Sequence, residues 1–171
     1  MRLVDEFGGD DARSMAVNNS PLRSAPWQHP GMPSIFDEVL NGLRPGEVVF
    51  QDERTFAFLD AEPVVVGHAL VVSKLAVDRI YELPPRDYQS VWATVRLLAP
   101  VLQAVTSTRR VVVLASGFDV PHAHVHLMPA DAREQVFGRS GATLPITKDE
   151  LAGLAARVRM ELQRAEIEPP G

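Results

Sequence analysis

The chain has 171 residues, of which 46% are hydrophobic and 23% charged, as in an ordinary globular protein with a single core. It contains no cysteine, which excludes disulfides, thiolate nucleophiles and cysteine-ligated zinc. The net charge of -5 and the lack of a Lys/Arg cluster argue against a nucleic-acid surface, because such a surface must neutralise phosphates.

Residues 1–33 are rich in Gly, Asn, Ser, Pro and acidic residues and have no sustained hydrophobic period, which predicts a flexible N-terminal arm. Trp27 and His29 stand out in this arm, but no chemistry is assigned to them. The arm lacks the apolar core of a signal peptide, and no apolar run approaches the roughly 18 residues of a membrane span. We therefore expect a cytoplasmic protein without membrane contact.

The first predicted element is a short amphipathic helix at residues 34–43, with Ser34 as N-cap and Gly42 near its end. The pattern then changes to strands rich in Val and Phe, which are predicted at residues 47–51, 55–59 and 69–73. The polar turn at residues 52–54 predicts that the first two strands form an antiparallel hairpin.

A long helix is predicted after Pro84 and Pro85, because apolar residues recur at intervals of three and four from Tyr88 to Val105. Pro100 falls inside this period and is expected to kink or divide the helix. A fourth strand at residues 110–115 and a fifth strand around the histidines at residues 122–126 follow.

A last helix at residues 147–164 begins with a capping box formed by Thr147 and Glu150. The order of elements predicts one α+β domain at residues 34–165. It contains a five-stranded antiparallel sheet with the main helix packed on it, plus the C-terminal helix.

The most informative feature is the alternation of His122, His124 and His126 with apolar residues. In an extended strand this places the three imidazoles on one face, about 6 to 7 Å apart, while the apolar residues enter the core. Histidine acts near neutral pH as a nucleophile, a proton donor or acceptor, or a metal ligand. Two chemical interpretations therefore follow from the array.

One interpretation is a metal site, because His-x-His on a strand is a familiar arrangement for first-row metals. The third ligand would come from His126, His68 or Glu134. Three histidines in one alternating row splay apart, however, and reach one ion only if the strand bends. The preferred interpretation has neither a metal nor a cofactor, and it rests on a family resemblance.

Residues 34–129 resemble the histidine triad (HIT) superfamily in four blocks that occur in the family's order. The segment Pro121-His122-Ala123-His124-Val125-His126-Leu127-Met128-Pro129 is similar to the family signature. The other blocks are Ser34-Ile35-Phe36, the strand of residues 55–59 followed by Asp60, and Gly67-His68-Ala69-Leu70-Val71 with Lys74. Four blocks in order are specific, whereas any one of them alone is weak.

The resemblance implies a hydrolase-type member that attacks the α-phosphorus of a nucleotide conjugate, such as a nucleoside phosphoramidate or a dinucleoside polyphosphate. It implies that His124 is the nucleophile and forms a covalent nucleotidyl-imidazole, which water then releases. His122 and His126 would donate hydrogen bonds to the phosphoryl oxygens, and His68 would complete the polar cluster.

The resemblance also implies a binding site for a purine nucleotide. Asp60 would accept hydrogen bonds from both ribose hydroxyls, since a carboxylate has two acceptor oxygens. The base would lie between apolar side chains, namely Ile35, Phe36, Phe58 and Leu59. Members of the superfamily usually pair edge strands and main helices, so a homodimer is expected.

The chain departs from the family before the triad, where the family carries an Asn or Gln and then Gly-Gln-x-Val. Here this stretch is shortened to residues 115–120, and Ser116 and Asp119 are the only side chains able to replace the missing amides. Asp119 would repel a phosphate unless it is protonated or turned toward a histidine, where it can orient the ring or protonate a leaving group. A nucleotide sensor without turnover therefore stays open beside the enzyme.

Overall fold

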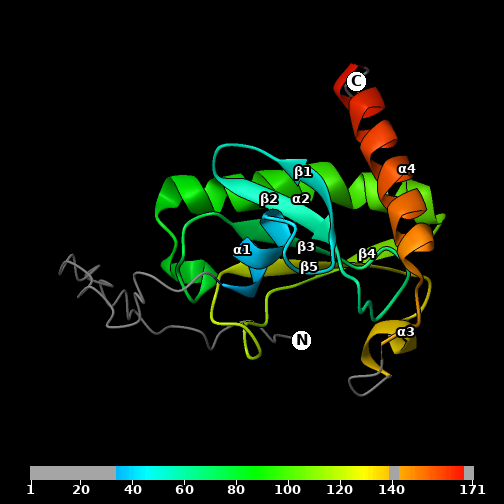
Figure 1. Cartoon of the computed structure of the whole chain (residues 1–171), viewed down its shortest axis with the longest axis horizontal. Helices are drawn as coiled ribbons and strands as arrows, with labels where there is room; N and C mark the ends of the chain where they lie inside the picture. The colour runs from blue at the N-terminus through cyan, green and yellow to red at the C-terminus, as the bar shows by residue number, and fades with distance from the viewer. Residues whose placement is uncertain (1–33, 139–142, 168–171) are drawn as a thin grey trace, which may run out of the picture.

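The centre of the fold is a five-stranded antiparallel sheet, seen in a computed structural model that describes residues 34–138 and 143–167 (Figure 1). The order across the sheet is β1-β2-β3-β5-β4. The strands are β1 (Glu47–Gln51), β2 (Thr55–Leu59), β3 (Ala69–Ser73), β4 (Arg110–Leu114) and β5 (His124–Ala130). The predicted fold class is thereby confirmed, whereas the predicted arm at residues 1–33 lies outside the described residues.

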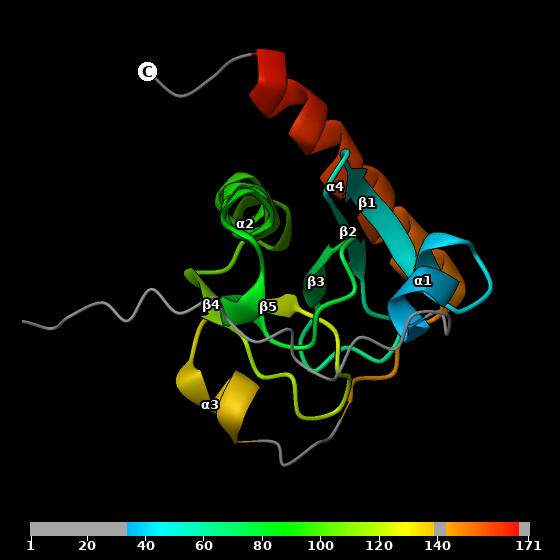
Figure 2. The same ribbon diagram turned by 90° about the vertical axis from the view of Figure 1, so that its left-hand side faces the viewer.

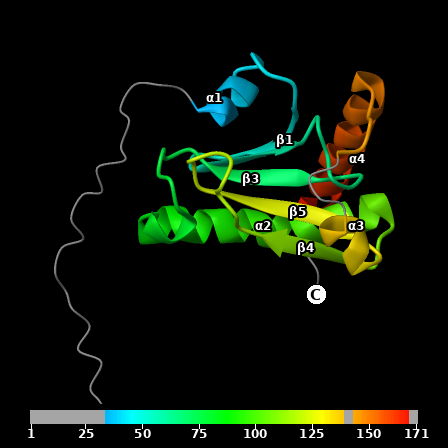
Figure 3. The same ribbon diagram turned by 90° about the horizontal axis from the view of Figure 1, so that it is seen from below.

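The helices cover the two faces of the sheet unequally. The long helix α2 (Pro85–Thr106) lies along one face and the short helix α1 (Ile35–Leu40) lies on the opposite side (Figures 2 and 3). Helix α4 (Lys148–Ile167) packs against α2 and β1. The main core forms between the sheet, α2 and α4, so the face toward α1 is left for a site.

The helix ends follow the predicted capping chemistry. Ser34 and Asp37 form a reciprocal capping box at the start of α1, and Thr147 and Glu150 form one before α4. Proline occupies the first turn of α2, where its missing N–H would have had no helical partner. Helix α2 continues through Pro100, so the expectation that this proline divides the helix is wrong.

Several elements differ from the expected ones. Helix α1 ends at Leu40 and not at residue 43, and α4 continues to Ile167. Strand β5 begins at His124, so His122 lies just before the strand and not within it. Two short elements were not predicted, the 3-10 turn η1 (Ile80–Glu82) and helix α3 (Arg133–Phe137).

No helix in the described part of the chain is both long and apolar enough to cross a membrane.

Candidate active site

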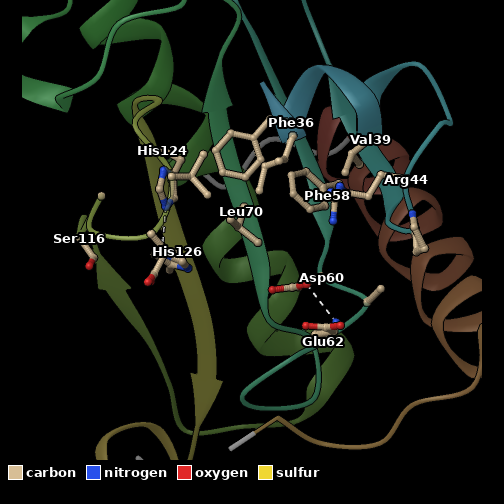
Figure 4. Close-up of a pocket in the computed structure, with 16 residues that line it drawn as sticks. Phe36, Val39, Arg44, Phe58, Asp60, Glu62, Leu70, Ser116, His124 and His126 are labelled. Carbon is tan, nitrogen blue, oxygen red and sulfur yellow. Dashed lines mark hydrogen bonds between the residues drawn. The ribbon is translucent and has the colours of Figure 1, made fainter. Parts of the chain in front are cut away.

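A pocket of about 460 Å³ opens on the sheet face that carries α1, and both His124 and His126 line it (Figure 4). Its walls come from α1, from the end of β2, and from the loop between β4 and β5. One side of the pocket is apolar and the other carries the histidines. A volume of this size is ordinary for the binding site of a small molecule.

The apolar wall consists of aromatic and aliphatic side chains from α1, β2 and β3. The rings of Phe36 and Phe58 have their centroids 5.9 Å apart and meet at 50°. Phe36 also lies edge-on to His124, with the centroids 5.0 Å apart. Ile35, Val39 and Leu70 complete this wall. The apolar wall thus reaches the imidazole of His124.

Leu59 does not belong to this wall, which corrects one of the expected contacts. Phe56 and Phe58 face the cluster around α1, whereas Ala57 and Leu59 belong to the core cluster on the side of α2. Side chains of a strand alternate between faces, so Phe58 and Leu59 cannot share one pocket. Leu59 is fully buried and serves as core.

His68 reaches the site from the start of β3 because of a tight backbone turn. Gly67 has a φ of +82°, and a Cβ at this position would lie 2.7 Å from Cγ2 of Thr106. Only glycine fits such a conformation and such a close approach. The turn places Nε2 of His68 3.0 Å from Nδ1 of His126.

The histidines form a chain of hydrogen bonds whose directions fix the tautomers of the neutral rings. Nδ1 of His124 lies 2.6 Å from the carbonyl oxygen of His122 and must donate, because a carbonyl only accepts. Nε2 of neutral His124 therefore holds a lone pair. Nε2 of His126, 3.1 Å away, must then carry the proton, and its Nδ1 accepts from Nε2 of His68.

Backbone groups hold both ends of this chain. The N–H of Val64 donates to Nδ1 of His68 over 3.4 Å, and Nε2 of the buried His122 donates to the carbonyl of Ser73 over 2.7 Å. With His68 neutral, Oδ2 of Asp60 lies 3.5 Å from its unprotonated Nδ1. That contact becomes an ion pair only when His68 takes up a proton.

The surroundings favour neutral imidazoles. Burial lowers the pKa of His126 to about 4, and the neighbouring His124 and His68 add to this shift. Burial also lowers the pKa of His124, although its hydrogen bond to the carbonyl of His122 and the carboxylate of Asp119 oppose the change. For His68 burial again lowers the pKa and outweighs the opposing effect of Asp60. At pH 7 the ring of His124 is consequently neutral, and its Nε2 keeps the lone pair that accepts the hydrogen bond from His126.

The polar residues expected at the site lie around the same pocket. Asp60 lines it from the end of β2, and its Oδ1 accepts the N–H of Glu62 over 3.0 Å. Ser116 and Asp119 line it from the loop before β5. Eight of the predicted site residues thus line one pocket, whereas Leu59 lies in the core. His68 and His122 lie outside the lining and contact His126 and His124, respectively.

Sequence reasoning missed several lining residues, among them Val39, Arg44 and Leu70. Leu70 pairs with Phe58 across β2 and β3 and therefore lies on the same face of the sheet. An alignment of these two predicted strands is the signal that could have identified it. Arg44 and Val39 offered no signal, since their place depends on how α1 folds over the sheet.

The described residues do not form a set of metal ligands, which was the alternative interpretation of the histidines. Within residues 34–138 and 143–167, no group of three or more His, Cys, Asp or Glu side chains is arranged to hold a metal ion. Glu134, one of the suggested third ligands, is exposed on α3, which follows the far end of β5.

Comparison with known proteins agrees with this geometry. The model of the HIT domain matches residues 41–133, which is more than half of the chain. An uncharacterized HIT-like protein of Methanocaldococcus jannaschii is 34% identical over 103 residues, which cover 56% of this chain and 77% of that protein. An adenosine 5'-monophosphoramidase of Schizosaccharomyces pombe is 25% identical over 77% of this chain and 100% of its own.

A bis(5'-nucleosyl)-tetraphosphatase of the same yeast is 30% identical over 88 residues, and the match spans about half of each chain, 48%. Among solved structures, a histidine triad nucleotide-binding protein of Sulfolobus tokodaii superposes with a TM-score of 0.68, covering 77% of this chain and 93% of that one at 22% identity. At this identity the superposition shows the fold alone. The matched domain, and the four sequence blocks around one pocket, show that the chain belongs to the HIT family.

Proposed function

We propose that this protein is a nucleotide hydrolase or nucleotidyl transferase that cleaves the bond to the α-phosphate of a nucleoside phosphoramidate or dinucleoside polyphosphate. The observation that carries the proposal is the orientation of His124. Its Nδ1 donates a hydrogen bond to the carbonyl of His122, which leaves the lone pair on Nε2. The ring that carries this lone pair lines the pocket. A neutral imidazole held in this way is a nucleophile that needs no separate base.

In the first step, Nε2 of His124 forms a bond to the α-phosphorus, and the bond from phosphorus to the leaving group breaks. The proton on Nε2 of His126, which lies 3.1 Å from Nε2 of His124, passes to the leaving group. His68 passes its Nε2 proton to Nδ1 of His126 over the 3.0 Å contact and takes up a proton from solvent at Nδ1, beside the carboxylate of Asp60, so that both rings end neutral. In the second step, water attacks the nucleotidyl-imidazole and the proton returns to the histidine chain.

The nucleotide is placed by the two walls of the pocket. The base packs on the apolar wall of Ile35, Phe36 and Phe58, and the carboxylate of Asp60 accepts hydrogen bonds from the ribose hydroxyls. This orientation leaves the α-phosphate next to His124 and His126. Two relatives support the substrate classes, because their names describe a phosphoramidase and a nucleosyl tetraphosphatase.

A nucleotide sensor without turnover is the second candidate, and the loop before the triad favours it. In this loop Ser116 and Asp119 stand where the family carries amides that can donate hydrogen bonds. A carboxylate cannot donate to a phosphoryl oxygen unless it is protonated, so transition-state stabilisation is weaker. The sensor and the enzyme share one pocket but differ in covalent chemistry.

The proposal is tested by a single-turnover mixture of excess protein with radiolabelled adenosine 5′-phosphoramidate, quenched in denaturant. We expect labelled AMP to be covalently bound, and peptide mapping to place the label on His124. The label should decay into free AMP as water completes the reaction. Binding without label or AMP would support the sensor, and a label on another residue would contradict the assigned nucleophile.

We further propose that the protein forms a homodimer through β4. This strand lies at the edge of the sheet, and Val113 and Leu114 on it are exposed. An apolar edge strand has free backbone groups that pair readily with a second copy. Helix α2 packs beside β4, so two copies of α2 would meet along the joined strands.

Replacement of Val113 by lysine is expected to raise the dimer dissociation constant at least about tenfold, because a charge on an edge strand opposes pairing. Sedimentation velocity over a concentration series measures the constant. Val66→Lys is the matched control, since Val66 is also exposed but lies in the loop between β2 and β3. A wild-type monomer at all concentrations, or equal effects of both variants, would argue against this interface.

A further inference from the structure

A second pocket of about 350 Å³ adjoins the candidate active site. It shares Ser116, Gly117 and His124 with the nucleotide pocket. Its other walls include Phe118 and residues 78–81, which run into the first part of η1. Ser116 and His124, which border both pockets, lie on the same side of the nucleotide pocket in Figure 4.

Backbone pairing holds this second pocket beside the triad. The N–H of Ala123 donates to the carbonyl of Val77 over 2.7 Å, which ties residues 78–81 to the segment between His122 and His124. Along this part of the chain, His126 and His124 line the nucleotide pocket, and His124 and His122 line the second one. His124 therefore stands at the boundary, where a bond between a nucleotide and another group would be cut.

Two exposed aromatic rings mark the second pocket as a binding surface. Phe118 is 94% exposed and Tyr81 is 73% exposed, although both belong to its lining. Large exposed aromatic side chains lose favourable burial unless a ligand covers them, and they stack well on planar groups. A planar organic group is thus the natural occupant.

The charges beside the second pocket disfavour an anionic occupant. Arg79 is the cation in the lining, and it contacts Asp78 at 3.9 Å and Glu82 at 2.9 Å, which leaves one net negative charge in this group. In the nucleotide pocket, Arg44 likewise contacts Glu38 at 3.0 Å. Among the described residues, no other Lys or Arg lines either pocket, so a chain of phosphates would find no unpaired cation.

We propose that the second pocket binds the leaving group of the substrate and selects a planar, neutral or cationic amine over a polyphosphate. The inference rests on the proposed function and names its substrate class. Attack by Nε2 of His124 breaks the P–N bond, and the proton from Nε2 of His126 goes to the departing nitrogen. The products are the nucleotidyl-imidazole and the free amine, which Tyr81 and Phe118 contact before release.

Three adenosine 5′-phosphoramidates of equal size test the selection by charge. Their amines are 4-(aminomethyl)benzylamine, 4-methylbenzylamine and 4-(aminomethyl)benzoate, which place a cation, a neutral group or an anion at the far end. We expect kcat/KM to fall in this order, by about tenfold from the cationic to the anionic substrate. Asp78→Asn should reduce this ratio of kcat/KM values to about threefold, and Arg79→Gln should increase it. Asp149→Asn, the same charge change on α4, should leave it unchanged.

The aromatic contacts are tested by comparison with the unsubstituted phosphoramidate, whose leaving group is ammonia. Tyr81→Ala and Phe118→Ala should lower kcat/KM for the benzyl substrate by about three- to tenfold each and spare the unsubstituted one. Phe137→Ala, which removes an exposed ring on α3, is the matched control.

The outcomes separate the two proposals. If the unsubstituted substrate is cleaved but the ratio of kcat/KM between the cationic and the anionic substrate is the same in wild type, Asp78→Asn and Arg79→Gln, the leaving-group pocket is wrong and the proposed function stands. If the anionic amine is preferred, the charge argument is overturned. If no phosphoramidate is cleaved, the proposed function fails and the inference fails with it.

Discussion

The His124→Ala variant is expected to lose turnover of adenosine 5′-phosphoramidate by at least about 10⁴-fold, while its affinity for AMP stays within about tenfold of wild type. The reason is that different residues of the pocket bind the nucleoside and react with the phosphate. The apolar wall and Asp60 hold the nucleoside, whereas Nε2 of His124 makes the bond to phosphorus. Removing a nucleophile raises the barrier of the chemical step and leaves ground-state binding largely intact.

Steady-state kinetics gives kcat, and calorimetric titration with AMP gives the dissociation constant. A thermal melt and the retained affinity serve as the controls for folding, because the imidazole of His124 is buried against Phe36. Turnover within tenfold of wild type would remove the nucleophile assignment. A parallel collapse of AMP affinity would show that the ring positions the nucleotide and would leave its chemical role unsupported.

The sequence predicted most of the fold because its local signals agree with the final packing. The capping residues of α1 and α4, the valine-rich strands and the period of α2 each indicate one element, and the structure contains them. Helix α3 gave no such signal, since it has five residues and its N-cap Ala132 offers no side-chain oxygen. Its position depends on contacts with β5 that no local pattern encodes.

The face of each residue in β2 was harder to predict. All five residues of this strand are buried, so the polar alternation that would distinguish the two faces is missing. Phe58 and Leu59 therefore looked equivalent, although only Phe58 lines the pocket. Pro100 shows the converse case, because packing along α2 preserves a helix that the local rule would divide.

The members of the histidine cluster could be predicted from the sequence, but the directions of the hydrogen bonds between them could not. Alternation placed His124 and His126 on one face, and the structure agrees. The direction of their hydrogen bonds, however, depends on the carbonyl of His122 and on His68 brought in by the turn at Gly67. Such three-dimensional relations decide which nitrogen is free, and one sequence does not contain them.

Replacement of Asp60 by alanine is expected to weaken the binding of AMP about 30-fold, and that of 2′,3′-dideoxy-AMP less than about threefold. The two ribose hydroxyls lose hydrogen bonds to a charged acceptor, each contributing roughly 1.5 kcal/mol or less when partly exposed. The dideoxy nucleotide never had these bonds. The difference between the two ligands isolates the ribose contact from any general disturbance of the loop.

Titration calorimetry with both nucleotides measures the effect, and Glu53→Ala in the exposed turn between β1 and β2 is the control for loss of a carboxylate. Asp60 also lies 3.5 Å from His68, so the variant has a second consequence. Without the carboxylate, protonated His68 loses its counter-charge, and the pKa of His68, already lowered by burial, falls further. Equal weakening of both nucleotides would contradict the ribose contact, because the loss of such a contact affects only the nucleotide that carries the hydroxyls.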